Sequence, residues 1–357
     1  MKAAVLYQPH LPLVVEEVDL RGPGPGEVVV RLAASGVCHS DYHVVKGEWA
    51  NDLPIVLGHE GAGVVEEVGE GVATVEPGDH VVLSWMPNCG RCTYCITGRP
   101  HLCDHPPEVD QASGMWKDNH RLNLFAHVAS FAEYTLVPES GAIPIREEMP
   151  LDRASLLGCG VMTGVGAAIN TARVRPGSTV AVFGCGGVGL NVIQGAALAG
   201  AGRIIAVDLT EEKLMFARRF GATDGVNAAG QNPVEAIGEL TGGAGVDYAF
   251  EAIGNLQAME QAYASVRKGG MAVIVGMPPH GERMSFPATL LYGERRLTGS
   301  LYGSANLRVD IPRLVDLYLA GKLDLDTLIT RRYALEEVNE AFAAMGAGQV
   351  GRGVIVF

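Results

Sequence analysis

No hydrophobic run in this sequence is long enough to cross a membrane. The longest apolar stretches, such as residues 180–183 and 271–275, have the length of single β-strands. Near the N-terminus, Gln8 and Pro9 interrupt the apolar residues before the core of a signal peptide would be complete. We therefore expect no membrane partner and a cytoplasmic location.

Positive charge is also scarce, because 27 Lys and Arg residues face 40 Asp and Glu residues, which gives a formal net charge of −13. The phosphate backbone of a nucleic-acid duplex would repel such a surface, so we expect no nucleic-acid partner. A small anionic ligand is not excluded, since one site can be locally basic. The seven cysteines of a cytoplasmic chain do not indicate a disulfide framework, so their spacing becomes informative.

The length of 357 residues is too great for one ordinary hydrophobic core, which favours two domains. The first 150 residues or so contain short apolar runs cut by Gly-Pro turn signals, typical of a β-rich, barrel-like domain. The clearest of these predicted strands are residues 28–32, 64–68, 80–83 and 131–137. The long segment 104–130 shows little periodicity, and we interpret it as a surface excursion.

Beyond residue 160 the predicted strands alternate with predicted helices, which indicates a parallel sheet covered on both faces. The predicted strands are 180–183, 204–207, 246–250 and 271–275, and the predicted helices between them are 190–199, 211–220 and 256–266. The C-terminal part is predicted to contain two helices and a final strand, residues 312–320, 335–345 and 353–357.

A glycine motif follows the first strand of this second part and precedes its first helix. It reads G-x-G-x-x-G, and its members are Gly184, Gly186, Gly187, Val188 and Gly189. In a dinucleotide-binding loop, the first glycine makes the tight turn and the second lets backbone N–H groups reach the pyrophosphate. The third lets helix and strand pack closely. By itself the motif fits an ordinary turn equally well.

The next predicted strand strengthens the dinucleotide interpretation. It ends in Asp208, 24 residues after the first glycine, where a carboxylate can accept hydrogen bonds from the ribose hydroxyls. Such a carboxylate repels a 2′-phosphate, which favours NAD over NADP. Lys213 is a second candidate for ribose contact, and a solvated lysine on a helix is the alternative for it. We therefore expect an NAD-binding domain.

Four of the cysteines lie close together in a C-x2-C-x2-C-x7-C pattern, namely Cys89, Cys92, Cys95 and Cys103. Four thiolates at such spacing suit a closed tetrahedral zinc site, which is structural because no coordination position is left for a substrate. The bacterial iron–sulfur spacing has its fourth cysteine after three residues and before a proline, whereas here the gap is seven and Asp104 follows. Zinc is therefore favoured, and four independent reduced thiols are the other alternative.

Cys38, His59 and Cys159 are scattered, but each has unusual neighbours. Cys38 opens the run Cys-His-Ser-Asp-Tyr-His, His59 precedes Glu60 in a glycine-rich stretch, and Cys159 stands between two glycines. Spacing alone does not bring three distant residues together, and a lone cysteine is often a small core residue. At this point, two interpretations of these three residues are equally supported: they form one metal site, or they are unrelated side chains.

Taken together, these motifs resemble the zinc-containing medium-chain alcohol dehydrogenases over nearly the whole chain. The run Gly-His-Glu-x2-Gly-x5-Gly-x2-Val at 58–72 matches the zinc signature of that family, and the other motifs follow in family order. The resemblance implies an α/β protein with a GroES-like β-rich catalytic domain and a Rossmann doubly wound parallel-sheet domain. The expected bounds are 1–160 for the first, with a structural zinc lobe over 88–104, then 161–301, and 302–357 for a segment that completes the catalytic domain.

The resemblance also assigns roles to the scattered residues. It makes Cys38, His59 and Cys159 ligands of a catalytic zinc, Glu60 a carboxylate that can approach the metal, and Asp41 the partner that orients His59. Two thiolates and one imidazole leave a fourth zinc position for water or the substrate oxygen. There the metal acts as a Lewis acid and favours the alkoxide, which gives hydride to the nicotinamide.

A proton relay and a set of contact residues follow from the same resemblance. The relay passes from Ser40 through a ribose hydroxyl to His43, for which a surface histidine is the alternative. Trp49 and Trp85 match positions that wall the substrate channel and would favour primary over bulky secondary alcohols, with core tryptophans as the alternative. The expected coenzyme contacts are His39 and Arg352 at the pyrophosphate, Thr163 and Val188 on the nicotinamide side, and Val275 as a further contact.

Within the family, the local match favours bacterial members. Residues 156–162 and 166–171 resemble the thiol-dependent formaldehyde dehydrogenases of actinobacteria, whereas His43 differs from them. We expect an NAD(H) oxidoreductase that interconverts primary aliphatic or aromatic alcohols and aldehydes, with one catalytic and one structural Zn²⁺ per chain. A thiol-adduct-dependent formaldehyde dehydrogenase is the alternative, and a non-catalytic zinc- and nucleotide-binding protein is the remote one. We expect a homodimer, with a homotetramer as the alternative.

Overall fold

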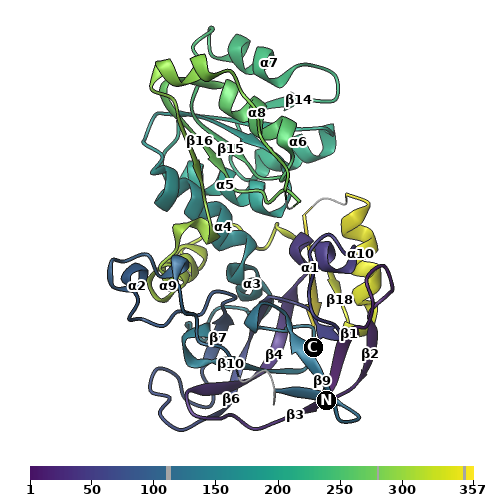
Figure 1. The fold of residues 1–357 in the computed structure, drawn as a ribbon. Coiled ribbons are helices and arrows are strands. Elements are labelled where there is room, and N and C mark those ends of the chain that lie inside the picture. Colours follow the sequence, from purple (N-terminus) through teal and green to yellow (C-terminus); the bar gives the residue numbers. More distant parts are fainter. Residues whose placement is uncertain (110–113, 280, 349–350) are drawn as a thin grey trace. The chain divides into compact units, whose positions relative to one another are not determined.

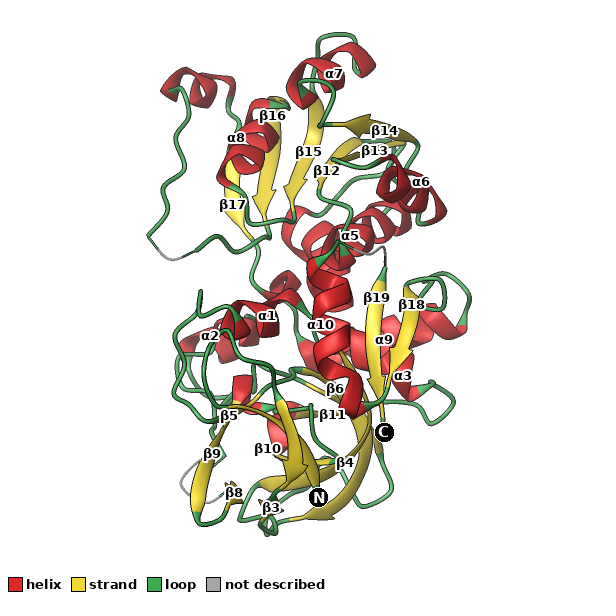
Figure 2. Ribbon diagram, turned by 90° about the vertical axis from the view of Figure 1, so that its right-hand side faces the viewer, coloured by secondary structure: helices red, strands yellow, loops and turns green. Residues whose placement is uncertain are grey.

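The computed structural model describes residues 1–109, 114–279, 281–348 and 351–357. The chain forms two compact units, one made of Met1–Cys159 with Asn306–Phe357 and the other of Gly160–Ala305. Figures 1 and 2 show the elements of each unit as ribbons.

The first unit is built mainly from two β-sheets. One has six strands in the order β2-β1-β5-β9-β8-β3, and the other has seven, β11-β7-β6-β4-β19-β18, with β10 also paired to β4. The strands are β1 Lys2–Leu6, β2 Val14–Glu17, β3 Asp19–Leu20, β4 Glu27–Gly36, β5 Ile55–Val56, β6 Glu60–Val68, β7 His80–Leu83, β8 Met115–Lys117, β9 His120–Leu124, β10 Tyr134–Pro138, β11 Ala142–Pro144, β18 Ile329–Tyr333 and β19 Arg352–Val356. The α-helices are α1 His39–Val45, α2 Thr93–Ile96, α3 Leu151–Ser155, α9 Leu307–Leu319 and α10 Val338–Gly346.

Alternating apolar residues place strand β4 at the centre of the seven-stranded sheet. Val28, Val30 and Leu32 are buried in one core cluster with residues of the neighbouring strands. Strand β4 pairs antiparallel with β6, β10 and β19. The last of these pairs joins the C-terminal strand to the N-terminal part of the chain, so that purple and yellow strands share one unit in Figure 1.

The second unit holds one sheet in the order β14-β13-β12-β15-β16-β17, and each of its strand pairs is parallel. Its strands are β12 Thr179–Phe183, β13 Arg203–Asp208, β14 Asp224–Asn227, β15 Val246–Glu251, β16 Val266–Ile274 and β17 Arg296–Gly299, and its α-helices are α4 Gly160–Gly166, α5 Gly187–Leu198, α6 Glu211–Arg219, α7 Pro233–Leu240 and α8 Leu256–Ala264. Helices lie on both faces of this sheet (Figure 2), and β12 is buried except at its first residue. The prediction of an α/β protein is confirmed.

The interpretation of residues 104–130 as a surface excursion is wrong in part. Strands β8 and β9 form an antiparallel hairpin within this segment. Asp118 and Asn119 connect the two strands with φ angles of 48° and 64°. Two successive positive φ angles match the twist of a tight hairpin, and Asp and Asn tolerate them well. Residues 110–113 of the same segment lie outside the described residues.

The predicted start of a helix at Pro312 is also wrong, since α9 begins at Leu307. The carboxylate of Asp310 accepts a hydrogen bond of 2.8 Å from the N–H of Asn306, which stabilises the true N-terminus. Pro312 lies inside the helix, where it has no backbone N–H to donate. The proline therefore marks the second turn of this helix rather than its beginning.

No single helix in the described ranges has the length and apolar composition needed to cross a membrane. One bent pair of helical segments, Leu151–Gly158 with Gly160–Ala172, meets those two criteria jointly.

Candidate metal centres and dinucleotide loop

Four side chains from distant parts of the sequence meet at one point in the first unit. The Sγ atoms of Cys38 and Cys159, a ring nitrogen of His59 and a carboxylate oxygen of Glu60 all lie within 4.8 Å of one another. Cys38 precedes α1, His59 and Glu60 stand at the start of β6, and Cys159 follows a short helical turn. The fold brings together the residues that sequence spacing left apart.

The orientation of His59 is set by Asp41 on α1. Nδ1 of His59 donates to Oδ1 of Asp41 over 3.1 Å, and the same oxygen accepts from the N–H of Gly58 over 2.8 Å. Because Nδ1 is engaged with Asp41, Nε2 is the nitrogen that can give up its proton and bind a metal. Within the described part of the chain this buried Nε2 has no hydrogen-bond partner, which is the state of an imidazole prepared to bind a metal.

The protonation of the cluster also fits a metal ion. The hydrogen bond from Cys159 lowers the pKa of Cys38 well below its ordinary value, and the same bond together with burial raises the pKa of Cys159. Burial opposes protonation of His59, but Asp41 and the Cys38 thiolate raise its pKa well above the ordinary value. Protons held among buried thiols and an imidazole are readily replaced by a divalent cation. Two thiolates and one imidazole nitrogen are donors that suit zinc.

Glu60 and Arg352 form a buried ion pair beside these donors. Burial raises the pKa of Glu60 to about 7, although Arg352 opposes this rise. Arg352 also donates to the carbonyl of Val37 over 3.1 Å. A Cβ on Gly36, which faces Glu60 across the β4–β6 pair, would overlap the Glu60 carboxylate. The structure ties Arg352 to the metal cluster, and the pyrophosphate contact expected for it stays a prediction.

Helix α1 carries the residues of the predicted proton path. Ser40 Oγ lies 3.9 Å from Cys38 Sγ. His43 follows one turn later on the same helix face, and its side chain is 24% exposed. His39 begins the helix and is exposed. The helix thus leads from the buried cluster to a partly exposed histidine.

The four closely spaced cysteines form a second cluster, because the Sγ atoms of Cys89, Cys92, Cys95 and Cys103 also lie within 4.8 Å of one another. Backbone N–H groups point at these sulfurs, as in the 3.3 Å contact from Cys92 to Cys89 Sγ. Backbone hydrogen bonds lower the pKa of Cys92 to about 6. Four sulfurs, one of which is mostly ionised at neutral pH, fit a closed zinc site.

The glycine loop joins β12 to α5 in the second unit. Gly184 has a φ of 96°, which makes the tight turn. A Cβ on Gly189 would overlap the carbonyl oxygen of Gly184, so this glycine is required by the packing of helix and strand. A Cβ on Gly186 would meet nothing within 4 Å, and α5 starts directly after it. Gly186 is therefore not required by contacts inside the protein, as expected where a pyrophosphate would approach.

Asp208 at the end of β13 is held beside this loop. Its Oδ2 accepts a hydrogen bond of 2.8 Å from the N–H of Cys185, and its Oδ1 accepts one of 2.7 Å from Leu209. Burial and the Asp208 charge raise the pKa of the Cys185 thiol, while Lys213 in the first turn of α6 opposes that rise. Cys185 is thus an unreactive thiol whose backbone fixes the carboxylate next to the glycine loop.

Comparison with known proteins decides the family. A model described as zinc-binding dehydrogenase matches residues 187–320, and one described as alcohol dehydrogenase GroES-like domain matches residues 24–147. An alcohol dehydrogenase zinc-binding domain protein from Burkholderia ambifaria is 37% identical, covers 100% of this chain and 98% of its own, and has a TM-score of 0.95. This chain belongs to the zinc-dependent medium-chain alcohol dehydrogenase family.

Two further solved structures are similar to this medium-chain dehydrogenase along the whole chain. Benzyl alcohol dehydrogenase from Acinetobacter calcoaceticus is 35% identical, with 100% of this chain and 99% of that chain covered and a TM-score of 0.94. A zinc-binding dehydrogenase from Sinorhizobium meliloti, bound to NADP, is 30% identical with coverage of 100% and 99% and a TM-score of 0.83. The chain is accordingly an oxidoreductase with a GroES-like and a Rossmann-type domain that uses zinc and a nicotinamide cofactor. The narrower bacterial branch stays a prediction.

The remaining predicted residues of the dehydrogenase lie in several elements. Trp49 and Trp85 are partly buried and pack against two different core clusters, which agrees with the core alternative and leaves the channel role a prediction. Glu48, whose carboxylate contacts His43, was not among the predicted site residues. The signal for it was Gly47, which ends α1 and turns the chain back. In the second unit, Thr163 is buried on α4, Val188 is half-buried on α5, and Val275 donates its N–H to Glu251.

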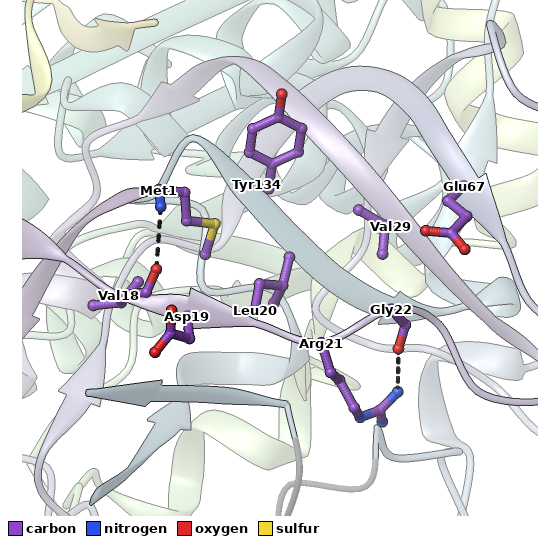
Figure 3. Close-up of a pocket in the computed structure, with 9 residues that line it drawn as sticks. All are labelled: Met1, Val18, Asp19, Leu20, Arg21, Gly22, Val29, Glu67 and Tyr134. Atoms are coloured by element: carbon purple, nitrogen blue, oxygen red, sulfur yellow. Dashed lines mark hydrogen bonds between the residues drawn. The ribbon is translucent and has the colours of Figure 1, made fainter. Parts of the chain in front are cut away.

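An open pocket of 360 Å³ lies elsewhere in the first unit, along β3 (Figure 3). The terminal amine of Met1 donates to the Val18 carbonyl over 3.1 Å, and Arg21 donates to the Gly22 carbonyl over 2.9 Å. Its lining residues are Met1, Val18, Asp19, Leu20, Arg21, Gly22, Val29, Glu67 and Tyr134. None of these is a residue of the metal clusters or the glycine loop, so the pocket has no place in the dehydrogenase site.

Proposed function

We propose that this dehydrogenase interconverts primary alcohols and aldehydes by hydride transfer with NAD(H), using a catalytic zinc ion held by Cys38, His59 and Cys159. The observation that carries the proposal is the convergence of these three donors on one point. Three protein donors leave one position of a tetrahedral zinc open, as in catalytic rather than structural sites. When bound, the zinc ion would supply a Lewis acid that favours ionisation of the alcohol.

The protein's own groups have distinct tasks in this proposal. Asp41 keeps the proton on Nδ1 of His59 and so keeps Nε2 available. Arg352 balances the buried charge of Glu60. Ser40 Oγ, next to Cys38, accepts the hydroxyl proton of the alcohol and passes its own proton along the path toward His43, which releases a proton to solvent at the exposed end.

The coenzyme is proposed to be NAD because of Asp208. The carboxylate is fixed by two backbone N–H groups beside the glycine loop, and it would repel a 2′-phosphate. The relative from Sinorhizobium meliloti is bound to NADP, so the preference needs a direct test. The ratio of kcat/KM with NAD to that with NADP should favour NAD in the parent and fall in Asp208→Ala. A parent that prefers NADP would reject this assignment.

Aromatic primary alcohols are the substrates that we favour. The support is the similarity to a benzyl alcohol dehydrogenase over the full length of both chains. The test is NADH formation by the purified zinc-loaded protein with benzyl alcohol, ethanol, and a primary alcohol paired with its branched secondary isomer. Equal kcat/KM for the two isomers would contradict the expected preference. Turnover of formaldehyde only with added thiol would favour the thiol-adduct alternative instead.

A second zinc ion is proposed at the four-cysteine cluster, with a structural role. The full protein should contain two zinc ions per chain by elemental analysis, one for each cluster. Cys38→Ser should lose one of them together with alcohol oxidation. Iron with visible absorbance in place of zinc would reject this assignment.

We also propose that the protein is a cytoplasmic homodimer that binds neither nucleic acid nor membranes. Strand β17 lies at the edge of the sheet of the second unit, and an edge strand can extend into the sheet of a second copy. Tyr292, shortly before this strand, is 90% exposed. Sedimentation equilibrium should give the mass of a dimer, and the mass of one chain would reject the proposal.

A further inference from the structure

The end of helix α1 brings two side chains against His43. The helix ends at Val45, Lys46 is its C-cap residue, and Gly47 follows with a φ of 67°. The N–H of Gly47 donates to the carbonyl of Val44 over 3.0 Å, and the N–H of Glu48 donates to the carbonyl of His43 over 2.9 Å. These two bonds form a Schellman motif, which holds residue 48 beside residue 43 through the backbone alone.

Glu48 and Trp49 both contact the imidazole of His43. Nδ1 of His43 donates a hydrogen bond to a carboxylate oxygen of Glu48. The indole of Trp49 stacks on the imidazole, with centroids 4.8 Å apart and planes inclined by 23°, and packs against a buried core cluster. Two other groups face this arrangement. Nζ of Lys46 lies 2.9 Å from the second carboxylate oxygen of Glu48, and the centroid of the His39 ring lies 6.4 Å from that of the His43 ring.

These contacts decide which nitrogen of His43 exchanges protons. A carboxylate acceptor favours the proton on Nδ1, and the free nitrogen is then Nε2. Stacking on an anchored indole restricts rotation of the ring. The His43 and Glu48 side chains are 24% and 32% exposed, and an ion pair at such exposure adds little to folding stability. Orientation of His43 is therefore the main consequence of the contact.

We propose that Glu48 and Trp49 are positioning residues that hold His43 with its proton on Nδ1, so that Nε2 accepts and releases the proton leaving the active site. This inference rests on the proposed function of His43 at the solvent end of the proton path. Glu48 contacts His43 in the same way as Asp41 contacts His59. In each pair a carboxylate oxygen accepts a hydrogen bond from Nδ1 of the histidine, so that Nε2 is the nitrogen left for function.

The test uses Glu48→Gln, which keeps the length of the side chain and removes its charge. Lys46→Met is the matched control, because it removes the neighbouring charge and leaves the carboxylate. With ¹⁵N-labelled histidine in the zinc-loaded protein, the signals of His43 are assigned by their loss in His43→Gln. The parent and Lys46→Met should show the Nδ1–H tautomer at neutral pH, and Glu48→Gln should show a mixture or the Nε2–H tautomer.

Kinetics provide the second readout. In Glu48→Gln, kcat for alcohol oxidation below neutral pH should fall about tenfold, which is part of the usual contribution of a general base. KM should change little, imidazole in the buffer should restore much of the rate, and Glu48→Asp should retain part of it. Trp49→Leu should lower kcat with the same rescue by imidazole, and Trp49→Phe, which keeps an aromatic ring on His43, should lose less of kcat than Trp49→Leu.

Two results would overturn the proposal. One is a Glu48→Gln protein with the parental tautomer and the parental pH profile of kcat. The other is a loss of kcat that is equal at all pH values, comes with a lower Tm and resists imidazole, as a structural defect would. A parent inactive toward every alcohol would reject the proposed function, and the ¹⁵N spectra would still decide whether Glu48 sets the tautomer of His43.

Discussion

At the scale of single residues, the metal cluster depends on groups that are not ligands themselves. Asp41 is fully buried behind His59, and its Oδ1 accepts hydrogen bonds from both His59 and Gly58. Such a carboxylate fixes the tautomer and the direction of the imidazole before any metal arrives. Metal affinity therefore depends on this aspartate as well as on the donors.

Replacement of Asp41 by Asn should lower zinc affinity at the catalytic cluster by about 10- to 100-fold, because the neutral amide orients His59 less firmly. Competition with a chromophoric chelator measures this change. Asp52→Asn, at an exposed position, is the control and should bind zinc as the parent does. Parental affinity in Asp41→Asn would show that the geometry of His59 is set elsewhere.

At the scale of elements, the glycines of the loop between β12 and α5 have different tasks. Gly189 is needed for the packing of helix and strand, whereas Gly186 leaves space that a ligand can occupy. Gly189→Ala should lower the free energy of unfolding by about 1–3 kcal/mol, because the added methyl overlaps the backbone at Gly184. Gly186→Ala has free space for its methyl group and should unfold like the parent while binding NAD more weakly. Thermal unfolding and NADH fluorescence titration measure the two effects. Unchanged NAD affinity in Gly186→Ala would place the pyrophosphate elsewhere.

A second prediction at this scale concerns Asp152, which joins α3 to β18. Its carboxylate accepts hydrogen bonds from Arg153 over 2.8 Å and from Arg332 over 2.7 Å. Burial opposes ionisation, but the two arginines hold the pKa of Asp152 below its ordinary value of 3.8. A carboxyl whose pKa is lower in the folded state stabilises the fold above the unfolded pKa. That contribution is lost as the pH falls through the folded pKa.

Asp152→Asn should therefore lower the free energy of unfolding by about 2 kcal/mol at neutral pH. The difference from the parent should shrink in acid below pH 3.8. Urea unfolding at several pH values measures it. Asp326→Asn removes a more exposed partner of Arg153, 60% exposed, and should cost less. A difference that persists unchanged in acid would contradict the role of the ionised carboxylate.

At the scale of the whole molecule, the two metal clusters should contribute differently to stability. Helix α2, between the second and fourth of the clustered cysteines, has no buried residue, so its segment has little core of its own. Cys95→Ser should therefore lower both the zinc content and the Tm, since structural zinc supplies folding free energy. Cys38→Ser should abolish alcohol oxidation with a smaller change in Tm, because its surroundings are packed strands. Equal changes in Tm would contradict this division of roles.

Much of this protein was readable from short stretches of sequence. The glycine loop, the four-cysteine spacing and the alternation of strands and helices each depend on residues that are neighbours along the chain. The turn at Gly47 belongs to the same class, because a glycine at the end of a helix returns the chain to a fixed position. The contact between Glu48 and His43 was thus predictable in principle, although it was overlooked.

Only the tertiary structure decided which distant residues meet. Cys38 and His59 converge because β4 pairs with β6 with Gly36 opposite Glu60, and Cys159 joins them because Gly158 lies against the backbone of Glu60. The buried pair of Glu60 and Arg352 forms because β19 pairs with β4. The register between two strands depends on their joint packing, so neither strand encodes it alone. Local sequence determined the kinds of site in this protein, and long-range strand pairing decided which side chains compose them.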